Sequence, residues 1–134
     1  MHETVKNLLK IEENIKSKFS NNVSNPKIIA VSKTFKMDHI KHLLEYGHKD
    51  YGENKVQEAN EKWSEIKKIK KINLHLIGGL QSNKVKVAVK LFDYIHSLDS
   101  IKLANKIAVQ EKELQKKIKL FIQVNIGNEK QKSG

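Results

Sequence analysis

A single lysine stands directly after an apolar run near the start of the chain. Residues 28–34 read IIAVSKT, so Lys33 follows a segment that is typical of a buried strand. A lysine at the end of a strand is most often a solvated flanking residue. An amine held in a pocket in its neutral form is instead a nucleophile. The pattern therefore leaves two interpretations open, a solvated flank or a reactive amine.

Three further polar side chains occupy positions where a ligand could bind. Asn54, in YGEN, and Asn125, in IQVNIG, come at or near the ends of two other apolar segments. Either amide could donate to a ligand, although Asn is also favoured at the start of a helix and Asn54 precedes an expected one. His75 lies inside LHLIG, where a lone histidine is more often packed and hydrogen-bonded than catalytic.

The composition excludes several classes of site. The chain has no cysteine, which excludes disulfides, thiolate catalysis and cysteine-ligated zinc, and we expect no metal site. The net charge of +11 favours a nucleic-acid partner, but all 26 basic residues are lysine. Specific base recognition favours arginine, and the lysines are spread along the whole chain. We therefore expect no nucleic-acid binding.

The first residues carry no targeting or membrane signal. Residues 1–19 mix charged and apolar side chains and contain no continuous apolar segment. The sequence therefore predicts neither a signal peptide nor a membrane span, and we expect a soluble, cytoplasmic protein.

Apolar periodicity predicts one helix followed by a regular alternation of strands and helices. In residues 3–19 apolar side chains recur at helical spacing, and the polar stretch 20–27, with the only proline, is expected to end this helix. Asp38 is the expected cap of the next helix, which ends at Gly47. Three more helices are expected over 55–69, 82–91 and about 100–116, the last opened by Asp99 or Ser100, and strands are expected over 27–33, 50–53, 73–78, 94–98 and 118–126.

Strands and helices that alternate at this spacing predict parallel βαβ units and an α/β fold class. Two architectures share this pattern, a doubly wound open sheet and a barrel. No glycine-rich dinucleotide motif or P-loop follows any expected strand. A (β/α)₈ barrel has eight strands and about 250 residues. Five strands in 134 residues therefore indicate the N-terminal portion of a barrel, with its first and fifth strands as unpaired edges.

Five short motifs then resemble one known family. They are AVSKT (30–34), YGENKVQE (51–58), LHLIGGLQSNK (74–84), IHSLDS (95–100) and IQVNIGNEKQKSG (122–134). In this order and spacing they resemble the YggS/PROSC family of pyridoxal phosphate homeostasis proteins, relatives of the barrel domain of alanine racemase. Each motif is short, but each falls at or just after an expected strand.

The resemblance implies a function and a set of cofactor contacts. Proteins of this family hold pyridoxal 5′-phosphate as a Schiff base, and the match of AVSKT places that role on Lys33. Asn54, His75 and Asn125 become candidate cofactor contacts. The implied role is a carrier, not an enzyme, that controls the intracellular level of the cofactor and supplies apoenzymes that depend on it. A racemase-like enzyme and a basic nucleic-acid-binding module are the alternatives, in that order.

The chain departs from the family in the segment that holds the cofactor phosphate. In the family, backbone amides of the last βα loops cradle the phosphate, and an arginine approaches the pyridine nitrogen. No corresponding segment occurs in residues 1–134, and the sequence contains no arginine. We therefore expect residues 1–134 to form a single, incomplete barrel domain, in which helix 3–19 precedes βα units that start at residue 27.

Overall fold

The five strands form one parallel sheet in which their spatial order equals their order in the chain. The computed structural model describes residues 1–19 and 26–134. A doubly wound sheet would place later strands on both sides of the first, whereas sequential order is the arrangement of a barrel. The strands are β1 (Ala30–Val31), β2 (Asp50–Glu53), β3 (Asn73–Leu76), β4 (Tyr94–Leu98) and β5 (Lys119–Ile122).

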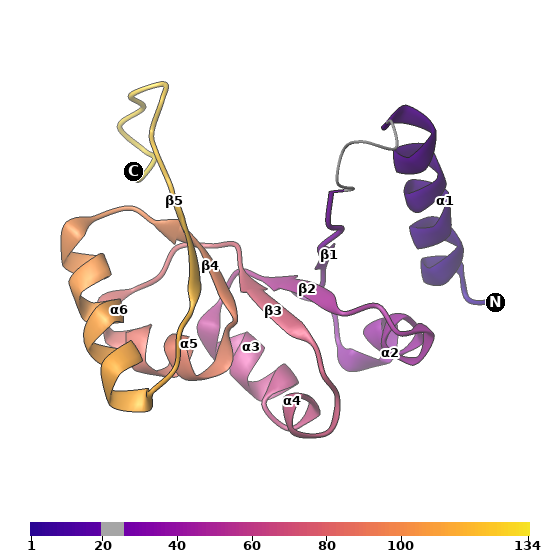
Figure 1. The fold of residues 1–134 in the computed structure, drawn as a ribbon, viewed down its shortest axis with the longest axis horizontal. Coiled ribbons are helices and arrows are strands. Elements are labelled where there is room, and N and C mark those ends of the chain that lie inside the picture. The colour runs from indigo at the N-terminus through magenta and orange to yellow at the C-terminus, as the bar shows by residue number, and fades with distance from the viewer. Residues whose placement is uncertain (20–25) are drawn as a thin grey trace.

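Helices follow each of the first four strands and cover one face of the sheet (Figure 1). The first helix, α1, precedes β1 and packs against α2 through a face that includes the buried Val5 and Leu8. The helices are α1 (Glu3–Lys18), α2 (Met37–Tyr46), α3 (Val56–Trp63), α4 (Ile66–Ile69), α5 (Val85–Leu91) and α6 (Ile101–Leu114), and a 3₁₀ turn, η1 (Ser82–Lys84), leads into α5.

The core lies between the sheet and the helices that follow its strands. Side chains alternate along a strand, so one set from β2, β3 and β4 points to the helices. Tyr51 on β2 is fully buried against Trp63 of α3, with ring centroids 4.8 Å apart. Leu74, Leu76 and Ile95 join them with no exposed surface. This apolar layer fixes each helix against the strand that precedes it.

The opposite face of the sheet is concave. Lys27, which precedes β1, donates a hydrogen bond from Nζ to Tyr94 Oη on β4 at 3.4 Å. In a flat sheet three inter-strand spacings would separate β1 from β4 by about 14 Å. A hydrogen bond between side chains that far apart in the strand order is consistent with a sheet that curves toward this face. The structure thus has the curvature that a barrel requires.

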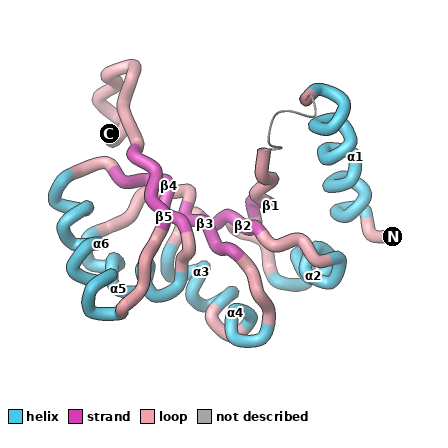
Figure 2. Tube along the Cα trace, viewed as in Figure 1, coloured by secondary structure: helices cyan, strands magenta, loops and turns pink. Residues whose placement is uncertain are grey.

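Most expected elements are confirmed, and the differences lie at their ends. The expected helix 3–19 and the strands 50–53 and 94–98 match α1, β2 and β4. The expected strand 27–33 is wrong in length, because only Ala30 and Val31 pair with β2 in the regular ladder. The expected strand 118–126 is likewise wrong in length, because only Lys119–Ile122 form β5. After β5 the chain turns away in a long loop (Figure 2). Residues 20–25 of the polar stretch expected to end the first helix lie outside the described residues.

Two expected helix features are also corrected. The expected helix 55–69 is divided into α3 and α4, because the Lys68 amide bonds to the Glu65 carbonyl, three residues back. Asp38 is not a cap, since α2 begins after Lys36 and Asp38 lies within its first turn. Ser100, by contrast, caps α6 and accepts from the Leu103 amide at 3.1 Å.

The β5 edge of the sheet carries exposed apolar side chains, as the sequence predicts for an unpaired strand. Phe121 is 52% exposed, and Ile122 on the same strand is 76% exposed.

Within residues 1–19 and 26–134, the helices lack the length and apolar character that crossing a membrane would demand.

Gly47 gives a test of the helix ends. It closes α2 at φ +104°, and its amide bonds to the carbonyls of Leu43 and Leu44. We expect Gly47→Ala to lower the free energy of unfolding by about 1 kcal/mol, because a Cβ disfavours the left-handed region. Gly79→Ala is the matched control, since an added Cβ there meets nothing within 4 Å. Urea unfolding in which both variants behave alike would contradict this account of the cap.

Candidate functional site

Lys33 lies in a tight turn immediately after β1, at the carboxyl edge of the sheet. The turn spans residues 32–35 and is closed by a hydrogen bond from the Phe35 amide to the Ser32 carbonyl at 3.2 Å. The predicted position at a strand end is therefore confirmed. The Lys33 side chain is exposed and Val31 beside it is 51% exposed, so the described residues do not enclose the amine in a pocket.

Ser32 anchors the start of this turn to β2. Its amide donates to the Gly52 carbonyl at 2.9 Å, which extends the β1–β2 ladder by one residue. Its side chain is buried and lies 3.4 Å from both the Gly52 carbonyl and Glu53 Oε2. The backbone immediately before Lys33 is therefore part of the sheet, although the lysine itself faces solvent.

A buried ion pair lies beneath the turn. Glu53, the last residue of β2, is 1% exposed, and its Oε1 lies 2.5 Å from Nζ of Lys62 on α3. Burial raises the pKa of Glu53, Lys62 opposes that shift, and the nearby Glu58 carboxylate adds to it. Lys62 also donates to the Ser32 carbonyl at 2.7 Å. One cation thus joins β2, α3 and the Lys33 turn.

Sequence reasoning did not identify Glu53, Glu58 or Lys62 as parts of this site. A signal was present in the alternation along β2. Tyr51 and Glu53 share one face of the strand, and Tyr51 belongs to the core. A carboxylate on that face requires a partner, and Lys62 on the next helix is the cation that supplies it.

Asn54 lies at the carboxyl end of β2, beside the Lys33 turn. The alternative that it caps α3 is wrong, because the cap residue is Lys55 and makes no side-chain cap bond. Asn54 Oδ1 is buried and has no hydrogen-bond partner among the described residues. The β3 loop packs tightly against it, since a Cβ placed on Gly78 would lie 2.8 Å from Asn54 Cβ. An unsatisfied acceptor is thus held firmly at the same edge as Lys33.

His75 lies within β3, deeper in the sheet than Lys33. It is 2% exposed, its Nε2 lies 2.9 Å from Asp50 Oδ1, and its Nδ1 lies 2.9 Å from His96 Nε2. A carboxylate only accepts, so His75 donates from Nε2 to Asp50. Burial and the neighbouring His75 lower the pKa of His96. Both ring nitrogens of His75 are thus engaged in the packed state, and its role as a cofactor contact stays a prediction.

Asn125 lies beyond β5, in the loop that ends the chain. Its Nδ2 donates to the Glu129 carbonyl at 2.7 Å, and its Oδ1 accepts from the Glu129 amide at 3.1 Å. Its amide group therefore organises the terminal loop. The structure brings Lys33 and Asn54 together on adjacent strands, whereas Asn125 follows the opposite edge strand. Its role as a cofactor contact also stays a prediction.

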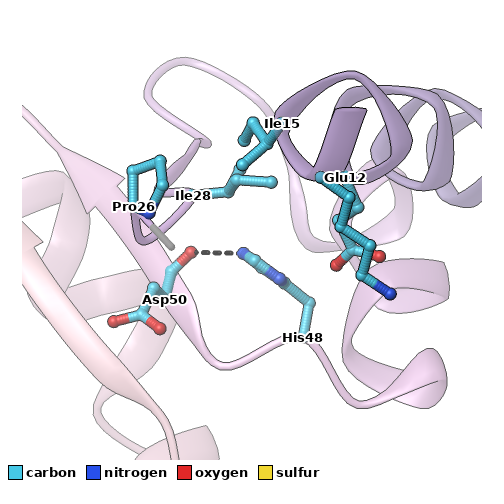
Figure 3. A pocket seen from close by; sticks show the side chains of 7 residues that line it. Glu12, Ile15, Pro26, Ile28, His48 and Asp50 are labelled. Carbon is cyan, nitrogen blue, oxygen red and sulfur yellow. Dashed lines mark hydrogen bonds between the residues drawn. The ribbon is translucent and has the colours of Figure 1, made fainter. Parts of the chain in front are cut away.

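A cavity of about 340 Å³ lies at the other end of the sheet (Figure 3). It opens between α1 and the starts of β1 and β2, where His48 Nε2 lies 2.9 Å from the Asp50 carbonyl oxygen. In parallel α/β barrels ligands bind at the carboxyl ends of the strands, so this cavity is not the candidate site. Its lining residues are Glu12, Ile15, Lys16, Pro26, Ile28, His48 and Asp50.

Comparison with known protein families gives one match along nearly the whole chain. Residues 7–134 match the model described as alanine racemase, N-terminal domain. A pyridoxal phosphate homeostasis protein of Pasteurella multocida is 36% identical over 96% of this chain and 57% of its own length. The protein of the same name from Escherichia coli is 30% identical over 100% of this chain and 59% of its own length. The chain therefore spans less than two thirds of these relatives.

Solved structures show the same arrangement. PipY of Synechococcus elongatus without pyridoxal phosphate has a TM-score of 0.79 and 36% identity, over 93% of this chain and 57% of PipY. PipY with pyridoxal phosphate bound has a TM-score of 0.74 and 37% identity, over 87% of this chain and 54% of PipY. The predicted fold class, the N-terminal portion of an alanine-racemase-like barrel, is confirmed by these matches.

The ion pair beneath the turn gives a stability test. Lys62→Met removes the cation and keeps most of the side-chain volume. We expect the free energy of unfolding at pH 7 to fall by about 3 kcal/mol, because a buried carboxylate without its partner is costly. Adding Glu53→Gln to that variant removes the unpaired charge and is expected to recover most of the loss. Urea unfolding in which the double variant is no more stable than Lys62→Met would contradict this account.

The same pair predicts a dependence on pH. Burial raises the pKa of Glu53 in the folded state above its unfolded value, so folding favours the protonated acid. Its contribution to stability is therefore fully present below the unfolded pKa and is lost as pH rises through the folded pKa. We expect the Lys62→Met defect to shrink as pH falls through this range, as measured by urea unfolding at a series of pH values. A defect of constant size would exclude Glu53 as its cause.

Proposed function

Because the chain belongs to the alanine racemase N-terminal domain family, we propose that it binds pyridoxal 5′-phosphate in intracellular homeostasis of that cofactor. In this proposal Lys33 holds the cofactor as a Schiff base. The single observation that carries it is the position of Lys33, in the turn that directly follows β1 at the carboxyl edge of a barrel-like sheet. Barrel active sites are built at this edge from residues at strand ends.

Two relationships support the choice of cofactor. The PipY structure with pyridoxal phosphate bound shares 37% identity and a TM-score of 0.74 with this chain. Relatives from Pasteurella multocida and Escherichia coli are named for pyridoxal phosphate homeostasis. The chain spans less than two thirds of the length of these proteins. That it has their complete activity is therefore part of the proposal.

The residues at the carboxyl edge fit the reactive end of the cofactor. When bound, the cofactor supplies an aldehyde that an amine captures reversibly. Nζ of Lys33 would form the new C=N bond to the aldehyde carbon, and the aldehyde oxygen would leave as water. Asn54 offers a buried amide oxygen that has no partner among residues 1–19 and 26–134. It is therefore a hydrogen-bonding group available beside the lysine.

We assign weaker roles to the two other candidate contacts. Both ring nitrogens of His75 are hydrogen-bonded to neighbouring strands. In this proposal His75 therefore stabilises the sheet next to the site and does not contact the cofactor. Asn125 would reach a cofactor only after giving up its bonds to Glu129.

A carrier fits the surroundings of Lys33 better than a catalyst does. A racemase needs an acid/base group on each face of the cofactor. Glu53, Glu58 and Lys62, the ionisable side chains that hydrogen-bond to the turn, are bound to one another. A carrier needs only the reversible bond to Lys33. Supply of the cofactor to apoenzymes, and a location in the cytoplasm, are parts of the same proposal.

The proposal is tested by trapping the bound cofactor. We expect the chain mixed with pyridoxal phosphate to absorb at about 420 nm, as a lysine Schiff base does. Borohydride reduction followed by peptide mass spectrometry should place the adduct on Lys33, and Lys33→Ala should abolish both signals. Lys36→Ala, which removes an exposed lysine three residues away, is the matched control and should retain them. Equal labelling across many lysines, unchanged in Lys33→Ala, would overturn the assignment.

The racemase alternative is tested with the same preparation. Incubation of the loaded protein with L-alanine should leave the optical activity of the solution unchanged over hours. Loss of optical activity that depends on Lys33 would instead establish the alternative enzyme function.

A further inference from the structure

Two charged side chains of α3 hold the Lys33 turn from both sides. Lys62 Nζ donates to the Ser32 carbonyl at 2.7 Å, immediately before Lys33. Glu58 Oε1 accepts from the Thr34 amide at 2.6 Å, immediately after it. The lysine side chain itself makes no hydrogen bond within the described part of the chain. The contacts that hold this residue are therefore those of the backbone on either side of it, which fix the point from which its side chain extends.

The Thr34 contact supports an unfavourable backbone conformation. Thr34 has φ +65°, in the left-handed region that β-branched residues rarely adopt. Such a residue persists only when its surroundings hold it there. Here a charge-assisted bond from its amide to Glu58 does so, and the Thr34 hydroxyl donates to the Lys33 carbonyl at 2.6 Å.

Glu58 and Lys62 are themselves held in place by ion pairs. Glu58 and Lys62 are one turn apart on the same face of α3, with Nζ and Oε1 3.4 Å apart. Lys62 is only 9% exposed and is bound to the buried Glu53. The turn is thus held by a rigid helix of the next βα unit, and not by flexible surface side chains.

We propose that Glu58 and Lys62 are positioning residues that orient Lys33 for capture of the cofactor aldehyde. This inference rests on the proposed function. A turn already held in its bound conformation needs no further ordering when the aldehyde arrives. Loss of the Glu58 contact should therefore slow the formation of the bond to Lys33 without removing the nucleophile.

The test uses Glu58 because it is partly exposed and its replacement spares the Glu53–Lys62 pair. Glu58→Leu removes the acceptor, and Glu58→Gln keeps an oxygen in the same place. Glu65→Leu is the matched control, since Glu65 is 82% exposed and its charge partner is Lys68 on α4. Thermal unfolding identifies variants that remain folded.

The first measurement needs no cofactor. Amide hydrogen exchange at Thr34 should become about tenfold faster in Glu58→Leu, which corresponds to the loss of roughly one hydrogen bond to a charged group. Exchange should be near wild type in Glu58→Gln and unchanged in Glu65→Leu. Unchanged exchange in Glu58→Leu would show that the contact does not hold the turn and would overturn the inference.

The second measurement is the rate of trapping at Lys33 with pyridoxal phosphate and borohydride. We expect about a tenfold slower rate in Glu58→Leu, rescue in Glu58→Gln and an unchanged rate in Glu65→Leu. An unchanged rate in a folded Glu58→Leu variant whose Thr34 exchange is faster would overturn the positioning role alone. Absence of trapping at Lys33 in the wild-type protein would instead overturn the proposed function. The positioning role of Glu58 and Lys62 would then be overturned as well.

Discussion

The buried ion pair between Glu53 and Lys62 is the interaction on which the candidate site depends. Glu53 ends β2 on the face that packs against the helices, where a lone carboxylate would be costly to bury. Lys62 supplies the opposite charge and also donates a hydrogen bond to the carbonyl of Ser32, which precedes Lys33. The charge balance of the core and the shape of the Lys33 turn are therefore set by the same ammonium group.

The two faces of the sheet carry different kinds of side chain. The face toward the helices is apolar apart from a few buried polar groups, and it holds the βα units together. The concave face carries a hydrogen-bonded row of Asp50, His75 and His96, on which Tyr94 and Phe121 stack. These rings fill part of the space inside the curved sheet. Lys33 and Asn54 lie beyond this row, at the edge where the strands end.

The exposed β5 edge shows how an open sheet of parallel strands differs from a closed one. Parallel sheets are usually covered on both faces. Here Phe121 and Ile122 are mostly exposed, and Val31 at the opposite edge is half exposed. Curvature without closure therefore explains why Lys33, at the end of an edge strand, faces solvent. The length of the relatives, of which this chain spans about 57%, is consistent with that geometry.

The sequence by itself determined the order of the elements, the parallel α/β class and the place of Lys33 after the first strand. These features depend on periodicity and turn residues, which act between close neighbours in the chain. The length, the number of strands and the motif resemblance also indicated a barrel, and the sequential strand order of the structure confirms it. Only the tertiary structure decided that Lys62 and Glu58 hold the Lys33 turn and that His75 bonds to Asp50 and His96. Such partners lie more than twenty residues apart, and strand register and curvature alone bring them together.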